Sequence, residues 1–173
     1  MIAASSCGGN DEHNSHKQDT TSHQAGKETA SAATATTEAA KLKDGNVDAI
    51  YQHYIHLTNA LIKEDAADAR MAASAIEAGA RELSNGQAIS AAAHAIAATG
   101  DVEQQRSSYA KLSDLMIKDA KSSGLKSGEL YVDYCPMAMN NKGAYWLSTK
   151  KEIVNPYFGE EMLNCGEIKE TIK

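Results

Sequence analysis

The chain has 173 residues, a formal net charge of −6 and nine aromatic side chains. This length fits one domain with a tail, and so few large side chains disfavour a wide sandwich or barrel. The lysines are scattered and form no basic stripe that could follow a phosphate backbone, so nucleic acid is not expected as a partner. No apolar run approaches the roughly 20 residues that a membrane-spanning helix needs.

Small side chains stand directly before Cys7 at the N-terminus. Residues 1–7 resemble the end of a bacterial lipoprotein signal, in which the cysteine sulfur receives the lipid. We therefore expect a remnant of such a signal, lipid attachment at Cys7, and a periplasmic or outer-membrane-anchored lipoprotein of a bacterium. The alternative is an ordinary free cysteine.

Residues 8–46 contain no aromatic side chain and no Val, Ile or Met. Such a segment cannot bury enough apolar surface to offset the entropy lost on ordering it. The composition predicts a disordered linker between the anchor and a folded domain that spans residues 47–173.

From Val47 to about residue 123, apolar side chains recur at the period of an amphipathic helix. A change of helical phase near Asp65 and turns at Asn85-Gly86 and Thr99-Gly100 divide this stretch into four predicted helices. The predicted inward positions are Ile50, Tyr54, Leu57, Leu61, Ala69, Ala72, Ala73, Ile76, Ala80, Leu83, Ile89, Ala92, Ala93, Ile96, Val102, Tyr109, Leu112, Met116 and Ala120.

Residues at the predicted helix ends have the expected chemistry. Asp65 is a suitable N-cap, because its carboxylate can accept from the unpaired N–H groups of the first turn. Asp101 with Gln104 resembles a capping box. Gly86 is expected to end a helix in the left-handed conformation, and Gly124 is expected to end the last helix.

Four helices joined by short turns favour a mainly α fold, an alanine-rich up-and-down four-helix bundle. The segment after Gly128 is expected to form an extended or irregular cap that carries Cys and Met. His53 lies at the edge of its apolar stripe and is a possible additional metal ligand, whereas His56 and His94 are expected on the surface. The chain has no Glu-x-x-His motif, which argues against a di-iron bundle.

The C-terminal segment holds two of the three cysteines and three of the six methionines. Cys135 and Met137 share a face of an extended chain, and Met162 and Cys165 lie on one side of a helical turn. Thiolate and thioether ligands select Cu(I). If the two pairs meet, they form a soft-metal site, to which Met139 could add a further thioether.

A disulfide between Cys135 and Cys165 is the alternative to this metal site. It would close a loop of about 30 residues and contribute roughly 3 to 4 kcal/mol to stability, with the methionines as core filler. The spacing alone favours the disulfide. In the disulfide interpretation the protein is an interaction module, which docks through the aromatic cluster of Tyr145, Trp146, Tyr157 and Phe158. Such aromatics are more often core residues than interface residues.

Four motifs in this segment resemble a bacterial domain-of-unknown-function family, number 3347. They are Tyr134-Cys135-Pro136-Met137-Ala138, residues 143–148, residues 153–159, and Met162-x-x-Cys165-Gly166. Members occur as exported lipoproteins and fused to periplasmic adaptor subunits of heavy-metal efflux pumps. The Cys-Pro-Met triplet is similar to a heavy-metal-binding segment of copper pumps, although the second Cys-x-x-Cys of that segment is missing here.

The resemblance implies metal handling in the cell envelope and favours the metal site over the disulfide. We therefore expect an exported lipoprotein that binds Cu(I) or another soft ion. Its partners would be the membrane, through the lipid anchor, and a heavy-metal efflux adaptor or copper-handling protein. No Ser/His/Asp set, phosphate loop or acid pair is present in the sequence, so an enzyme is not expected.

Overall fold

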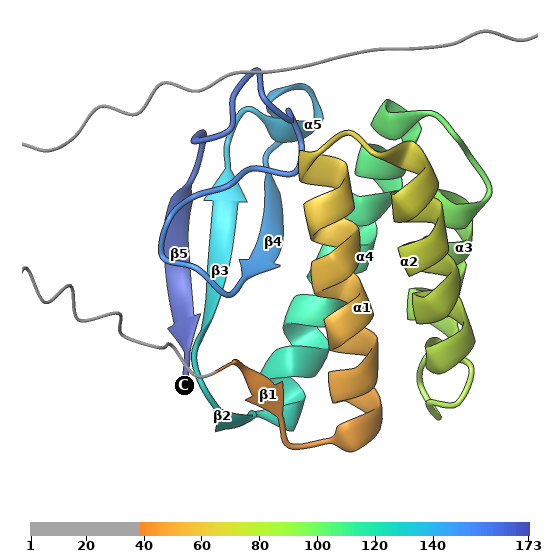
Figure 1. Ribbon diagram of the computed structural model, residues 1–173. Helices are drawn as coiled ribbons and strands as arrows, with labels where there is room; N and C mark the ends of the chain where they lie inside the picture. Colours follow the sequence, from red (N-terminus) through yellow and green to blue (C-terminus); the bar gives the residue numbers. More distant parts are fainter. Residues whose placement is uncertain (1–38) are drawn as a thin grey trace, which may run out of the picture. The chain divides into compact units, whose positions relative to one another are not determined.

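The computed structural model describes residues 39–173, and its fold is mainly α with small antiparallel sheets (Figure 1). The helices are α1 (Gly45–Ile62), α2 (Ala66–Ala80), α3 (Gln87–Ala97), α4 (Val102–Ser123) and α5 (Ala138–Asn141). The strands are β1 (Lys41–Leu42), β2 (Leu125–Ser127), β3 (Leu130–Cys135), β4 (Ala144–Ser148) and β5 (Glu167–Ile172).

The four long helices pack each on the next, and α4 also contacts α1 and β4. Figure 1 shows the β4-β3-β5 sheet beside α1 and α4, with α2 and α3 on the side away from it. Helices α1 and α4 therefore lie between the sheet and helices α2 and α3. None of the helices within residues 39–173 is long and apolar enough to span a membrane.

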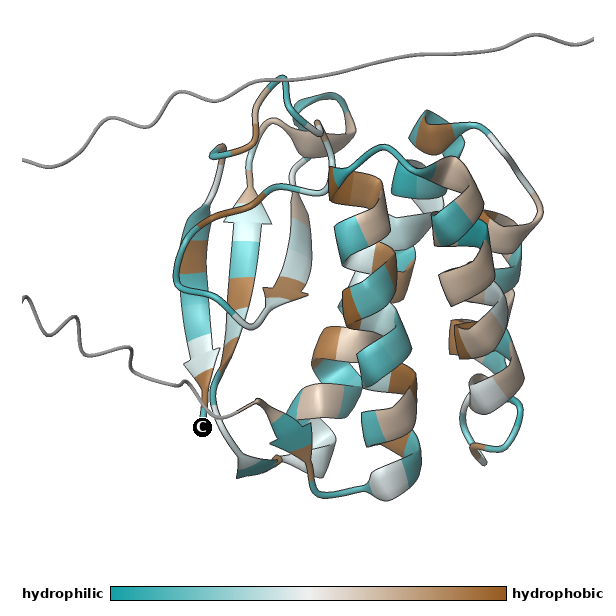
Figure 2. Cartoon of the chain, viewed as in Figure 1, coloured by the Kyte–Doolittle hydropathy of each residue, from teal (hydrophilic) through white to brown (hydrophobic). Residues whose placement is uncertain are grey.

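The apolar stripes predicted from the helical period form the core. Of the inward positions, Leu83, Ala92 and Val102 are partly buried and all the others are buried. Figure 2 shows hydrophobic and hydrophilic residues in alternating bands along α1, as expected of an amphipathic helix. His56 and His94 are exposed, which confirms their predicted surface positions, and His53 is exposed as well.

Acidic side chains cap the helices where the sequence predicts them. The carboxylate of Asp65 accepts from the N–H of Asp68, and that of Asp101 accepts from Glu103 and Gln104. The return bond of a capping box is absent at Asp101, because the hydroxyl of Thr99 accepts from its N–H. Helix α4 is still capped, because the Asp101 carboxylate accepts from two N–H groups of its first turn.

Gly86 has a role that differs from the predicted one. Its φ of −78° is right-handed, and it precedes α3 rather than ending α2 in the left-handed conformation. A Cβ at this position would lie 1.8 Å from the carbonyl oxygen of Ala80. Glycine is thus required by close approach of the backbone. Gly124 ends α4, as predicted, and has a positive φ of 70°, which favours glycine.

The C-terminal cap is more regular than predicted. Strand β3 pairs antiparallel with β4 on one side and with β5 on the other. The sequence suggested extended or irregular structure, because Pro136 interrupts a strand-forming run. In the structure this proline comes directly after β3, where it interferes with no strand pairing.

The linker boundary predicted at residue 46 is also corrected. Lys41–Leu42 pairs with β2, and Ala40 and Leu42 are buried. A strand of two residues is too short to show an alternation of polar and apolar residues, so the sequence did not predict this strand. The remainder of the predicted linker, together with residues 1–7 and Cys7, lies outside the described residues.

Buried hydroxyl groups join the helices to the sheet. The hydroxyl of Tyr54 on α1 lies 2.8 Å from Ser113 Oγ and receives hydrogen bonds from the Tyr109 hydroxyl and from the backbone N–H of Leu147 on β4. Tyr109 also meets Thr58. These bonds fix β4 relative to α1 and α4, because buried polar groups are costly unless they are paired.

Candidate metal site

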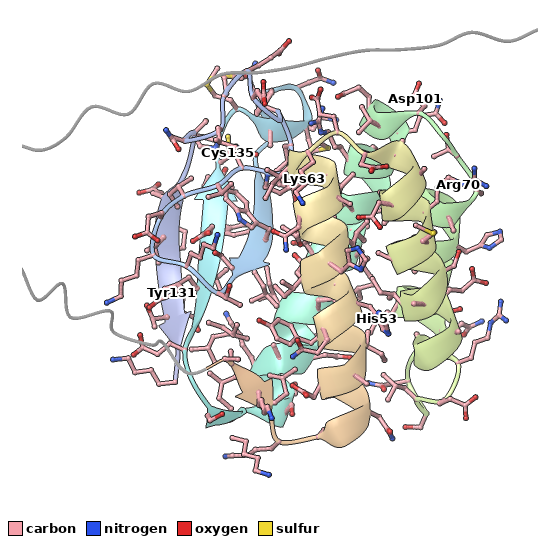
Figure 3. All side chains as sticks on the ribbon, viewed as in Figure 1. His53, Lys63, Arg70, Asp101, Tyr131 and Cys135 are labelled. Carbon is pink, nitrogen blue, oxygen red and sulfur yellow. The ribbon has the colours of Figure 1, made fainter. Side chains whose placement is uncertain are left out.

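The antiparallel register brings the sulfur-rich segments to one end of the sheet. Cys135, the last residue of β3, lies opposite Ala144, the first residue of β4, and Tyr134 lies opposite Glu167, the first residue of β5. The turn that follows β3 and the loop that precedes β5 therefore meet at this end. Figure 3 labels Cys135 there, next to α5.

The two cysteines predicted to meet do so. The Sγ atoms of Cys135 and Cys165 lie 2.8 Å apart, and both are free thiols. Cys135 is fully buried and Cys165 is partly exposed. Hydrogen bonding to Cys135 and burial raise the pKa of the Cys165 thiol to about 11. Both the metal interpretation and the disulfide interpretation require the two cysteines to lie close together.

The three C-terminal methionines line one hollow of about 560 Å³, beside α5. Met137 is 47% exposed, whereas Met139 and Met162 are partly buried. Phe158, from the loop, and Glu103 and Ser107, from α4, form other parts of the wall. Soft thioether donors from two segments more than 20 residues apart thus line the same hollow.

The turn that carries Met139 has an unusual backbone. Met139, Asn140 and Asn141 have φ values of 52°, 56° and 64° in succession. Left-handed geometry costs roughly 1 to 2 kcal/mol for an ordinary residue, and less for Asn. Met139 is therefore held in a strained position on the wall of the hollow. Strain of this kind is concentrated at functional sites in proteins.

Gly143 completes this left-handed turn. Its φ is 79°, and its N–H donates to the carbonyl of Ala138. A Cβ at this position would lie 2.0 Å from the hydroxyl of Tyr134. Any other residue would push the turn away from the sheet.

Asn155 fixes the loop that carries Met162 and Cys165. It is fully buried; its backbone N–H donates to Leu163 and its side-chain amide donates to the carbonyl of Cys165, both at 2.7 Å. Its side-chain oxygen accepts from the N–H of Tyr157. The loop is closed at its base by one amide side chain, which sets the position of the Cys165 backbone.

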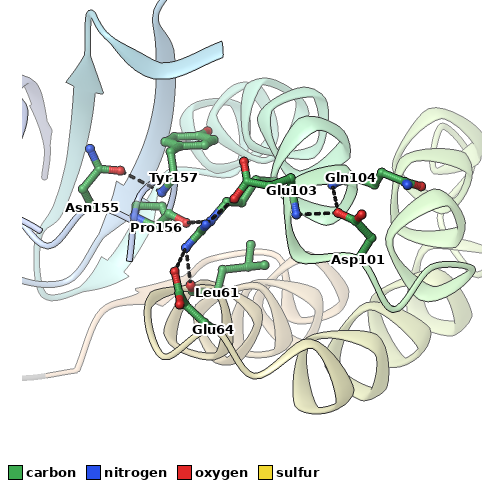
Figure 4. Close-up of polar contacts among 9 residues, drawn as sticks. Leu61, Glu64, Asp101, Glu103, Gln104, Asn155, Pro156 and Tyr157 are labelled. Carbon is green, nitrogen blue, oxygen red and sulfur yellow. Dashed lines mark hydrogen bonds and ion pairs between the residues drawn. The ribbon is translucent and has the colours of Figure 1, made fainter. Parts of the chain in front are cut away.

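Arg106 attaches the same loop to the helices. This α4 residue is buried, and it donates to the carbonyl oxygens of Pro156 and Leu61 and to the carboxylates of Glu64 and Glu103 (Figure 4). A buried guanidinium is tolerated because these acceptors satisfy it. No sequence pattern indicated this role, since arginine in an amphipathic helix is usually a surface residue.

Asp133 is a buried carboxylate without a partner. It is fully buried, and both of its oxygens lack hydrogen-bond partners. Burial raises its pKa to about 7. By strand alternation it shares a face of β3 with Cys135. The sequence shows that Tyr131, Asp133 and Cys135 alternate along a strand. It does not show that Asp133 is buried, because this burial depends on the elements that pack against the strand.

The other residues considered in the sequence lie apart from this site. His53 is on the exposed side of α1 and does not line the hollow. Trp146 and Tyr157 are buried, as expected of core residues, whereas Tyr145 is 39% exposed. Within residues 39–173 no three His, Cys, Asp or Glu side chains are grouped to hold a metal ion.

The fold defines a mainly α domain that supports a small sheet and a sulfur-rich loop. Residues 50–128 match the family described as "Protein of unknown function (DUF3347)", which is the family that the resemblance predicted. The matched segment runs from α1 to the end of β2, so the sulfur-rich motifs lie beyond it. Comparison with curated proteins and with solved structures found no match.

Proposed function

We propose that this protein binds Cu(I) or a similar soft ion through the thioethers of Met137, Met139 and Met162. The observation that carries the proposal is that three of the six methionines of the chain line one hollow. Thioether sulfur is neutral and polarisable and selects Cu(I) over harder ions.

Features of these methionines favour a ligand role over core packing. Methionine usually fills irregular gaps in the core. Met137 instead exposes nearly half of its surface, and Met139 occupies a strained left-handed position. The exposure of Met137 does not improve packing, and it leaves this side chain within reach of an ion from solvent.

Cys135 and Cys165 would be secondary donors. Two metal–sulfur bonds of about 2.3 Å at a tetrahedral angle separate the sulfurs by about 3.8 Å. The observed 2.8 Å between the thiol sulfurs is shorter. The two cysteines can bind one ion together only after they move apart, so the proposal gives the primary role to the methionines.

The task of the protein would be to hold or pass Cu(I) in the bacterial cell envelope. In this proposal α1–α4 form an up-and-down bundle that supports the loop, and lipid at Cys7 anchors the chain, with an efflux adaptor or copper-handling protein as recipient of the ion. The methionine-lined hollow supports the metal part of the proposal; the anchor rests on the residues around Cys7.

Lipid attachment is tested by metabolic labelling. When a complete signal precedes the chain, a clickable fatty acid should label the wild type but not Cys7→Ser, because the lipid is carried by that sulfur. In-gel fluorescence of the purified proteins measures the difference. Equal labelling of both would remove the anchor from the proposal.

Copper binding is tested by anaerobic competition against a Cu(I) chelator. The triple variant Met137→Leu/Met139→Leu/Met162→Leu should bind Cu(I) at least tenfold more weakly than the wild type. Leucine keeps volume and apolarity nearly constant, so the fold should be retained. Met71→Leu is the matched control, because Met71 is 65% exposed on α2 and away from the hollow.

Indistinguishable affinities of the wild type and the triple variant would contradict the proposal. If Cys135→Ser loses Cu(I) affinity and the triple methionine variant does not, the thiols rather than the thioethers bind the ion. Weak copper binding by all proteins, together with strong destabilisation on reduction, would favour the alternative, an interaction module stapled by a Cys135–Cys165 disulfide. The short distance between the two sulfurs is the observation that supports this alternative.

A further inference from the structure

We infer that the Cys135–Cys165 thiol pair reduces Cu(II) to Cu(I) beside the methionine hollow. This inference rests on the proposed function and adds a reaction to it. The structure joins two chemistries at one end of the sheet, a pair of thiols in contact and a set of ligands that prefers the reduced ion.

The thiol pair is arranged for oxidation to a disulfide. The two sulfurs are already in contact at 2.8 Å, so bond formation needs only a small movement. Cys165 is partly exposed and accessible to an ion from solvent, whereas Cys135 is buried behind it. This asymmetry gives Cys165 the first contact with the oxidant and makes Cys135 the resolving thiol.

The pair adjoins the hollow through Met137. This residue follows Cys135 by two positions, and its side chain lines the hollow. On the other segment Met162 precedes Cys165 by three positions, in a turn closed by the N–H of Cys165. An ion reduced at the thiols is thus next to the thioethers.

The reaction balances with Cu(II) as the oxidant. Two Cu(II) ions each gain one electron and become Cu(I). The two thiols lose these two electrons, the two S–H bonds break, and one S–S bond forms. Both protons pass to water from the exposed side of Cys165. Thioether binding of the product favours reduction, because it stabilises Cu(I) relative to Cu(II).

The test uses the full-length chain with Cys7→Ser, so that only the two thiols of interest remain. Reduced protein, freed of reductant, is mixed anaerobically with two equivalents of CuCl₂. The paramagnetic resonance signal of Cu(II) should disappear at two ions per chain. Titration of denatured protein should show the loss of both thiols, and the intact mass should fall by two hydrogen atoms.

Two variants link the reaction to its site. Cys165→Ser cannot close the intramolecular bond, so it should reduce at most half as much Cu(II) and give disulfide-linked dimers. The triple methionine variant keeps both thiols but should react at least tenfold more slowly, because it no longer stabilises the product. Met71→Leu should react at the wild-type rate.

Survival of both thiols in the presence of Cu(II) would overturn the inference, as would equal rates in the wild type and the triple methionine variant. The underlying proposal is tested separately, by Cu(I) competition on protein whose disulfide has been formed with diamide. If the oxidised protein binds Cu(I) but the reduced protein does not reduce Cu(II), the proposed binding function stands and only the proposed reaction is wrong.

Discussion

Replacement of Leu112 by alanine should lower the free energy of unfolding by about 2 to 5 kcal/mol, the cost of removing a large side chain from a packed core. Leu112 lies on α4 and is fully buried in the main hydrophobic cluster. Because α4 also contacts α1, α3 and β4, the resulting cavity would affect both the helices and the sheet. Urea denaturation followed by circular dichroism measures the change.

Leu57→Ala should have a similar effect, since Leu57 is fully buried on α1. His94→Ala provides the control, because this side chain is exposed and its pairing with Glu77 is a surface contact. The control should change stability by less than about 0.5 kcal/mol. A destabilised His94→Ala beside an unaffected Leu57→Ala would show that the inward faces of the helices are wrongly assigned.

Asp133 should make the protein less stable as the pH rises from 5 to 8. Its pKa is about 7 in the folded protein, above the ordinary value of 3.8, so the folded state binds its proton more tightly than the unfolded state does. The stability that this group contributes is fully present below about pH 4 and is lost as the pH rises through 7. The loss between pH 5 and 8 should be on the order of 2 to 3 kcal/mol.

Asp133→Asn should remove this part of the pH dependence, because the amide does not ionise in this range. The free energy of unfolding of both proteins is measured in urea at pH 5, 6, 7 and 8. The free energy of unfolding of the variant should increase relative to that of the wild type as the pH rises. This difference reports on Asp133 alone, because both proteins share the other titrating groups. Parallel curves would show that the Asp133 carboxylate is solvated or paired in solution.

The helical part of the fold could be predicted from the sequence because its determinants are local. The apolar positions of α1–α4 recur at the helical period, and Asp65 and Asp101 satisfy N–H groups that lie two or three residues away. The burial of Leu57 and Leu112 follows from the same pattern. None of these features depends on residues distant in the sequence.

Features that rest on distant contacts could be predicted only in part or not at all. Gly86 is required by the carbonyl of Ala80, and the short β1 is ordered only because β2 pairs with it. Arg106 is buried because acceptors on α1 and on the loop after β4 surround it. Sequence patterns indicate the helical or strand period of an element. The environment of these residues depends instead on where other elements lie.

The sulfur site combines both kinds of information. The amino-acid sequence shows which donors are present and that Met137 and Met162 each stand close to a cysteine. It does not show that the two pairs meet, because Cys135 and Cys165 are 30 residues apart and are brought together by the register of β3 with β4 and β5. The strained turn of Met139 likewise depends on the close packing of Gly143 against the sheet, a contact that no local pattern encodes.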